Sequence, residues 1–242
     1  TLSLCQDVQA EAYDYPETLF DEKVWTTRRP QPDADELANA IALIKASQKP
    51  VIVAGGGVLY SQATKELAAF AEAHAIPVVV TQAGKSSINE THPLAIGSVG
   101  VTGTSAANAI AEETDLVIAV GTRCQDFTTG SWALFKNDSL RMVGLNIAAY
   151  DAVKHDSHPL VTDAREGLKA LSSGLSGWKA PAALAEKATA EKKVWMEAAA
   201  KAMVSGLKGV YVKSYEFKVD GAFGAADVDR VRQQFSGPGW SR

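Results

Sequence analysis

Short, wholly apolar runs alternate along the chain with longer segments whose apolar residues recur every three or four positions. The short runs predict buried strands at residues 50–54, 77–81, 116–120 and 141–146, and an edge strand at 160–162. The longer segments predict helices at residues 33–48, 61–74, 106–112 and 163–171. Three of these helices have good N-cap candidates, namely Asp33 or Asp35, Thr104 or Ser105, and Asp163. The pattern is typical of a parallel sheet covered on both faces and predicts an α/β fold, a Rossmann-like doubly wound sheet.

The two ends of the chain lack this alternation. Residues 9–32 are acidic, aromatic and proline-bearing, which predicts an irregular linker. Residues 1–5 alternate like a strand and open without methionine, so we expect a chain cut from a longer one; the resemblance given below implies that residues 1–9 are the last strand of a preceding domain. A long helix is predicted at 182–205, a strand at 210–219 and a helix at 227–235. The predicted parts are a domain end and linker (1–32), a Rossmann-like central domain (33–175) and a helical extension with a divergent tail (176–242).

Composition and charge narrow the classes of partner. With 242 residues, of which 46% are hydrophobic, the chain can bury a sizeable core. A net charge of −4 provides no basic stripe for a phosphate backbone, which argues against a nucleic-acid partner. The apolar runs are too short to span a bilayer, which argues against a membrane partner. Cys5 and Cys124 have neither zinc-site nor disulfide spacing, so we expect reduced thiols in a cytoplasmic protein.

A glycine run follows the first predicted strand and consists of Gly55, Gly56 and Gly57. Such a run suits close approach of the backbone to a phosphate or ribose, because glycine permits a tight turn and leaves N–H groups exposed. The dinucleotide-binding fingerprint is incomplete: Tyr60 stands where a further glycine belongs, and Thr81 and Gln82 stand where an acid would follow the second strand. Between a tight βα turn and a nucleotide site, the motif alone favours the turn.

A second glycine series precedes the helix predicted at 106–112. Gly97, Gly100 and Gly103 lead to a hydroxyl-bearing cap, so an anion would meet free N–H groups there. Glycines also precede helices where no ligand binds. Both interpretations stay open.

Polar residues follow the buried strand at 116–120. An arginine in this place needs an anionic partner, and the sequence offers Arg123 two of them, the Asp126 carboxylate or a ligand phosphate. These two partners are equally compatible with the sequence. For Asp126 itself a structural salt bridge is favoured over a catalytic role, because no second carboxylate or histidine is placed beside it by sequence.

Four further residues favour structural interpretations. Cys124 has no evident histidine base and is expected to be an inert buried thiol. His74 lies at a helix end, where a cation is favourable. His155 and His158 lie in a loop where no helix fixes their spacing, so solvated side chains are favoured over a metal site. The sequence therefore predicts no metal site and no catalytic residue in this chain.

These segments, in this order, resemble the central domain of thiamine-diphosphate-dependent enzymes of the acetolactate synthase type. Within that family they resemble most the hydrolases that open the ring of a trihydroxycyclohexane-dione in inositol degradation. The resemblance extends to about residue 203 and is carried jointly by Thr1-Leu-Ser-Leu-Cys-Gln-Asp-Val-Gln9, Arg28-Arg-Pro-Gln-Pro32, Pro50-Val-Ile-Val-Ala-Gly-Gly-Gly-Val-Leu-Tyr-Ser61, Thr81-Gln-Ala-Gly-Lys85, Gly100-Val-Thr-Gly-Thr104 and Val120-Gly-Thr-Arg-Cys-Gln-Asp-Phe-Thr-Thr-Gly-Ser-Trp132.

The resemblance implies a parent hydrolase that acts on a C–C bond in a ketone. Its other two domains, one pyrimidine-binding and one diphosphate-binding, would hold thiamine diphosphate and magnesium. Neither the glutamate-bearing domain nor a Gly-Asp-Gly motif occurs in this sequence, so we expect the chain to be inactive alone, with those domains as partners and with self-association into a homo-oligomer. The alternatives are the central domain of an acetolactate synthase and a stand-alone nucleotide-binding or oligomerisation module.

The central domain of the flavin-binding relatives holds FAD, so the resemblance implies an FAD or ADP site here. Phe127 replaces a basic residue of those relatives, and Asn146 stands where an acidic residue is common, so an ADP-type or empty site fits as well as FAD. The matching positions in this chain are Gly55, Gly56, Gly57, Thr81, Gln82, Gly97, Gly100, Gly121, Arg123 and Asp126.

Overall fold

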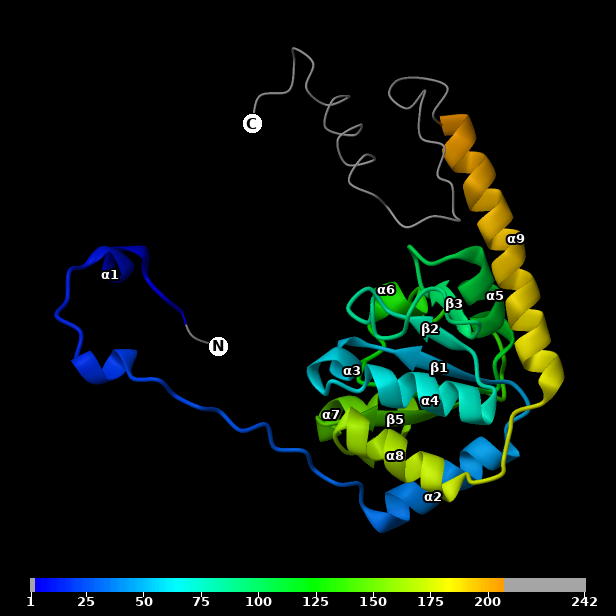
Figure 1. Ribbon diagram of the computed structural model, residues 1–242, viewed down its shortest axis with the longest axis horizontal. Helices are drawn as coiled ribbons and strands as arrows, with labels where there is room; N and C mark the ends of the chain where they lie inside the picture. The colour runs from blue at the N-terminus through cyan, green and yellow to red at the C-terminus, as the bar shows by residue number, and fades with distance from the viewer. Residues whose placement is uncertain (1–2, 207–242) are drawn as a thin grey trace, which may run out of the picture. The chain divides into compact units, whose positions relative to one another are not determined.

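The computed structural model describes residues 3–206, which contain a six-stranded sheet in the order β3-β2-β1-β4-β5-β6 (Figure 1). All neighbouring strands are parallel. The order reverses between β1 and β4, as it does in doubly wound Rossmann-like sheets. The predicted α/β class and fold are confirmed. The strands are β1 (Pro50–Ala54), β2 (Val78–Val80), β3 (Ala95–Ser98), β4 (Leu116–Val120), β5 (Arg141–Asn146) and β6 (His158–Val161).

Helices cover both faces of the sheet. On one face α8 contacts both α2 and α4, and these three form the layer nearest the viewer in Figure 1. The crossover through α5 runs back from β3 to β4, so right-handed connections place α5 on the opposite face. The helices of this region are α2 (Ala34–Ala46), α3 (Gly56–Tyr60), α4 (Thr64–His74), α5 (Ser105–Glu113), α6 (Asp126–Thr129), α7 (Ala149–Ala152) and α8 (Ala164–Gly174), with a 3-10 turn η2 (Lys154–Asp156).

The core and the helix caps follow the sequence pattern closely. Every residue of β1 and β4 is buried, as expected for central strands covered on both faces. Asp33, Thr104 and Asp163 accept backbone N–H groups in the first turns of α2, α5 and α8, which confirms Asp163 and selects Asp33 over Asp35 and Thr104 over Ser105. The predicted long helix is present as α9 (Ala182–Gly206), and its buried Leu184 packs into the core.

Three expectations about the elements are incomplete or wrong. β3 is not predicted, because its run is short and contains Gly97 at φ +126°, beside a shift in its register with β2. The helix expected from residue 61 begins only at Thr64, as α4, because Gln62 takes φ +54°, and the short helix α3 that precedes it was not predicted. Residues 3–5 form no strand, since nothing in the described chain pairs with them. Instead α1 (Gln6–Ala10) and the 3-10 turn η1 (Glu17–Phe20) interrupt an otherwise irregular segment.

Two predicted elements of the tail, the strand at 210–219 and the helix at 227–235, lie outside the described residues. Within residues 3–206, no helix combines the length and the apolar composition that a bilayer crossing requires. The fold that positions the candidate site is therefore the parallel sheet with its two layers of helices.

Candidate functional site

The parallel sheet brings most of the predicted site residues to one edge, which we call the carboxyl edge. It consists of the connections that follow the strands, namely residues 55–60, 81–84, 99–103, 121–132, 147–153 and 162–163. Ligands of doubly wound sheets bind at this edge, where the strand order reverses. Here the reversal lies between β1 and β4, so the loops that begin at Gly55 and Gly121 meet there.

The glycine run is used to pack two loops against each other. The Gly55 N–H donates to the Val120 carbonyl (2.8 Å) and the Gly57 N–H to the Gly121 carbonyl (2.9 Å). A Cβ on Gly57 would lie 2.6 Å from the Gly121 Cα, and a Cβ on Gly55 would collide with the Gly121 oxygen. Two of the three N–H groups are thus occupied inside the fold. These contacts favour the tight turn over a phosphate cradle as the reason for Gly55 and Gly57.

The second glycine series is also closed internally. Asn108 on α5 accepts the Gly100 N–H (3.0 Å) and donates to the Gly100 carbonyl (3.0 Å), while the Gly103 N–H donates to the same carbonyl (2.9 Å). Gly100 has φ +114°, and a Cβ there would collide with the Phe127 oxygen. The N–H groups of Gly100 and Gly103, which were expected to be free for an anion, are therefore bonded within the loop and stabilise it. Asn108 is a residue that sequence reasoning missed, although its amide lies one turn into the helix that follows the glycines.

The residues after β2 likewise hold loops together. Thr81 is buried, and its hydroxyl accepts the Gly84 N–H at 3.0 Å. The Gln82 amide donates to the Thr102 hydroxyl at 3.0 Å, which joins the loop after β2 to the loop after β3. Thr81 is thereby turned to the interior, whereas Gln82 stays at the surface.

Arg123 and Asp126 have no side-chain partner in the described part of the chain, and both are exposed. The salt bridge between them, favoured for Asp126 and left open for Arg123 by the sequence, is therefore not formed. The reason is local: Cys124 takes φ +43° and is buried, and α6 begins at Asp126, so the chain turns between the two charged residues. Arg123 keeps a guanidinium available to an anion at the point where the strand order reverses.

The loop that contains Arg123 is stabilised by contacts of Cys124, Trp132 and His155. Burial raises the pKa of the Cys124 thiol to about 11, in line with the predicted inert thiol. The His155 Nε2 lies 3.1 Å from the Cys124 carbonyl, and its ring packs edge-on against Trp132 at 4.4 Å. His155 makes these contacts at φ +58° while its residue stays exposed, so the expected solvated side chain also has a structural contact that the sequence did not indicate.

Metal-ligating residues do not converge anywhere in residues 3–206, where no group of three or more His, Cys, Asp or Glu is placed to hold an ion. His158 belongs to β6 and is exposed, so it lies apart from the His155 contact. His74 is buried, and its Nδ1–H donates to the Trp178 carbonyl at 2.8 Å. The expectation that His74 merely provides a helix-end charge therefore omits its structural hydrogen bond.

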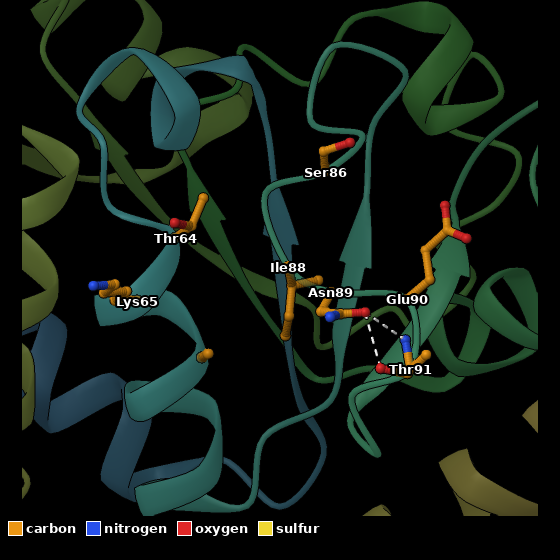
Figure 2. Close-up of a pocket in the computed structure, with 8 residues that line it drawn as sticks. Thr64, Lys65, Ser86, Ile88, Asn89, Glu90 and Thr91 are labelled. Atoms are coloured by element: carbon orange, nitrogen blue, oxygen red, sulfur yellow. Dashed lines mark hydrogen bonds between the residues drawn. The ribbon is translucent and has the colours of Figure 1, made fainter. Parts of the chain in front are cut away.

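A hollow of about 640 Å³ lies between α4 and the chain that leads from β2 to β3 (Figure 2). Thr64 and Lys65 line it from α4, and Ser86 and Asn89 from the opposite wall. The Asn89 side-chain oxygen accepts the N–H (3.0 Å) and the hydroxyl (2.9 Å) of Thr91, which stiffens that wall. None of the predicted site residues lines this hollow.

Exposed apolar side chains form a feature of the carboxyl edge that the sequence did not reveal. We call them the apolar rim; they are Leu59, Tyr60, Val101, Phe127, Ile147, Tyr150 and Val153. Apolar residues beside strands read as core in a sequence, so their exposure has no clear signal. The resemblance offered one signal, because it implies a basic residue where this chain has Phe127.

Comparison with known proteins gives this geometry a context. Residues 37–171 match the family described as "Thiamine pyrophosphate enzyme, central domain". The chain is 45% identical over 195 residues to 3D-(3,5/4)-trihydroxycyclohexane-1,2-dione hydrolase 2 of a Bacillus cereus strain, covering 81% of this chain and 30% of that protein. The hydrolase of the same name from Clostridium perfringens (strain 13 / Type A) is 43% identical over 196 residues, covering 81% and 31%.

A third relative is similar over a shorter region. The 3D-(3,5/4)-trihydroxycyclohexane-1,2-dione hydrolase of Bacillus anthracis is 47% identical over 171 residues, covering 71% of this chain and 27% of the relative. The chain therefore spans about 30% of the length of the relatives it matches.

Proposed function

The chain belongs to the thiamine pyrophosphate enzyme central-domain family, and on that premise we propose that it is the central domain of a hydrolase that opens the ring of 3D-(3,5/4)-trihydroxycyclohexane-1,2-dione. The observation that carries the proposal is the 45% identity to a relative of that name over 195 residues, far more than the fold alone requires. The same relatives favour this activity over the acetolactate synthase alternative. On this proposal, the whole enzyme acts in inositol degradation.

The chemistry of such an enzyme resides outside this chain. Thiamine diphosphate, when bound with magnesium, supplies the nucleophilic carbon that C–C cleavage beside a ketone requires. The residues present do not fit that cofactor: the sequence has no Gly-Asp-Gly motif, and no metal-ligating group converges in residues 3–206. This chain contributes a folded domain, and the exposed Arg123, Asp126 and apolar rim at its carboxyl edge are the groups available for binding. It is inactive without the remaining parts of the parent, which are its partners.

Calorimetry and a ring-opening assay test whether the cofactor and the activity depend on the other domains of the parent. The isolated chain is expected to release no heat with thiamine diphosphate and magnesium and to leave the dione intact, while the full-length Bacillus cereus relative serves as the positive control. Cofactor binding by the chain at micromolar concentration would contradict the proposal. A relative that fails to open the dione would remove its basis.

A nucleotide site is the second candidate function, and Arg123 is the observation that favours it. The exposed, unpaired guanidinium lies where nucleotides bind doubly wound sheets. The glycine N–H groups fit a diphosphate less well, since those of Gly55, Gly57 and Gly100 are occupied. We infer that ADP or FAD is held through Arg123, with Gln82 and Asp126 as the other exposed polar side chains of the predicted set.

The domain organisation and the oligomeric state and location of the chain complete the proposal. The division into parts at residues 1–32, 33–175 and 176–242 remains our proposed organisation. A homo-oligomer of the chain in the cytoplasm is proposed as well, supported by the apolar rim and by two cysteines that form no disulfide. Sedimentation of the purified chain and fractionation of the source cells check these two points.

A further inference from the structure

A largely buried ion pair joins the segment before α2 to the carboxyl edge. The Arg29 Nη1 donates to both carboxylate oxygens of Asp163 (3.2 and 3.1 Å), and the two side chains are 21% and 3% exposed. The Asp163 N–H and the Thr162 hydroxyl both donate to the Pro30 carbonyl, at 3.1 and 2.8 Å. All of these contacts are made inside the domain, so they do not depend on what covers its surface.

The same guanidinium nitrogen also holds the end of α3. It donates to the Ser61 carbonyl at 2.7 Å, and the Ser61 hydroxyl donates to Asp163 at 2.8 Å. Ser61 is buried and directly follows α3, a helix of only five residues. A helix this short is not stable by itself, and the carbonyl groups at its end favour a cation. Arg29 provides that cation and thereby fixes the position of α3.

Hydrogen bonds continue from Ser61 to the loop that contains Arg123. The Ser61 N–H donates to the Gly57 carbonyl (2.9 Å), and the Gly57 N–H donates to the Gly121 carbonyl (2.9 Å). The two glycines pack so closely that a Cβ on Gly57 would lie 2.6 Å from the Gly121 Cα. Gly121 lies two residues before Arg123. An unbroken series of hydrogen bonds therefore joins Arg29 to the loop that presents the Arg123 guanidinium.

Stability alone is a weak reason for the ion pair. The desolvation of a buried carboxylate and its partner offsets much of their attraction, so such pairs add little to the free energy of unfolding compared with apolar residues. Their geometry is specific, by contrast: one nitrogen of Arg29 is bonded to three oxygens from Ser61 and Asp163, which are 102 positions apart in the sequence. The ion pair thus sets how these segments lie relative to one another.

We propose that Arg29 is a positioning residue of the nucleotide site: it holds α3 and, through Gly57 and Gly121, keeps Arg123 where the phosphate of ADP or FAD binds. The inference rests on the nucleotide site proposed above and adds a residue that acts through the fold rather than by contact with the ligand. It makes the affinity for the nucleotide depend on the segment by which the chain enters the domain.

A double-mutant cycle on the full chain, measured by titration calorimetry with ADP and with FAD, tests the proposal. Arg29→Ala is expected to raise the dissociation constant about fivefold or more, as for residues that are coupled to a site without contacting its ligand. In an Arg123→Ala chain the same change should raise it no further, because the group that Arg29 positions is then absent. A loss of stability alone would not produce this dependence on Arg123.

Two further variants separate positioning from folding. Asp115→Ala loses hydrogen bonds from the Gln48 and Lys49 N–H groups at the start of β4, outside the series described above, and should leave the dissociation constant unchanged. Arg29→Ala with Asp163→Asn removes the ion pair without leaving a buried charge, and the amide can still cap α8. This double variant should fold, as circular dichroism checks, and replaces Arg29→Ala in the cycle if that chain does not fold.

The outcomes distinguish the positioning role from the site itself. An affinity that is unchanged by the loss of Arg29, or a loss of affinity that is equal with and without Arg123, would overturn the positioning role and leave the nucleotide site intact. An unaltered chain that binds neither ADP nor FAD would remove the nucleotide site and this inference with it. The hydrolase assignment is independent of both results, because its test is cofactor binding and ring opening.

Discussion

At the amino edge of the sheet, where β1 and β4 begin, polar side chains are paired within the fold, whereas the carboxyl edge keeps charged and apolar side chains free. Asp115 accepts from the Ser47 hydroxyl, from the Gln48 N–H (2.8 Å) and from the Lys49 N–H (2.9 Å). The buried Thr114 hydroxyl donates to the Lys49 carbonyl at 2.7 Å. No member of the apolar rim lies at this edge.

The difference shows which part of the molecule holds the fold and which is available for binding. Disturbing the hydrogen bonds of the amino edge is costly where they involve the buried hydroxyls of Ser47 and Thr114, because these groups would lose their partner without gaining water. At the carboxyl edge the loops pack closely against one another at glycines. The side chains of Arg123 and Asp126 nevertheless make no contact with a partner in the described part of the chain. A ligand or partner bound there takes no interaction away from the core.

Removing an acid from each end of β4 is expected to give the largest contrast. Asp115→Ala removes the acceptor of three donors and should lower the free energy of unfolding by about 1–2 kcal/mol, because the Ser47 hydroxyl is buried while the Gln48 and Lys49 N–H groups can bond water instead. The matched Asp126→Ala change should alter it by less than about 0.5 kcal/mol. Urea denaturation measures both, and equal losses would abolish the distinction between the edges.

The two cysteines provide a second contrast, in reactivity. Roughly one part in a thousand of a thiol with a pKa of about 11 is ionised at pH 8, so Cys124 should be alkylated at least about 100-fold more slowly than the exposed Cys5 in dilute solution. Mass spectrometry after limited alkylation identifies the labelled site. Rapid labelling of a Cys5→Ser chain without denaturant would show that the loop after β4 is open.

Arg123→Ala should weaken ADP or FAD binding by about 1–3 kcal/mol, because a charge-assisted contact with phosphate is lost. Stability should be unchanged, since the side chain has no partner among the described residues. Arg141→Ala, an exposed arginine at the start of β5 on the amino edge, is the matched control and should leave affinity intact. Affinity that is equal in both variants would make Arg123 irrelevant to nucleotide binding.

The smallest effect concerns acid pH at the amino edge. Hydrogen bonds from Lys187 (2.5 Å) and Lys49 (3.3 Å) lower the pKa of Glu113 in the folded chain. Its contribution is therefore present above the unfolded pKa and is lost as the pH falls through the folded one. The half-exposed pair is screened by solvent, so the loss should be only a few tenths of a kcal/mol. Glu113→Gln should remove this part of the acid dependence in urea denaturation, and an unchanged profile would exclude it.

The fold was largely predictable from the sequence because buried strands and helix caps depend on local patterns. β1 and β4 are apolar throughout, and Asp163 caps α8 as its position before the helix predicts. β3 was missed because its short run is completed only by pairing with β2, with a glycine at φ +126° in its middle. That pairing is a long-range contact that no local period records.

The candidate site was predictable only in its location. The rule for parallel sheets placed Gly55, Gly121 and Arg123 at one edge before any geometry was known. The motif alone favoured a tight turn at residues 55–57. The sequence did not reveal that Asn108 closes the loop at Gly100, or that Asp126 has no partner among the described residues, because both depend on where a turn directs the next residue. The apolar rim was hidden for the same reason, since apolar residues read as core until their exposure is known.

Hydrogen–deuterium exchange of the full chain, with and without saturating ADP or FAD, tests most directly whether the carboxyl edge is the binding edge. The account predicts slower exchange in peptides that cover residues 121–132 and 81–84 when a nucleotide is added. Peptides of the amino edge, residues 45–49 and 113–116, should be protected already and should not change. Nucleotide-dependent protection at the amino edge, or none at the carboxyl edge, would contradict the account.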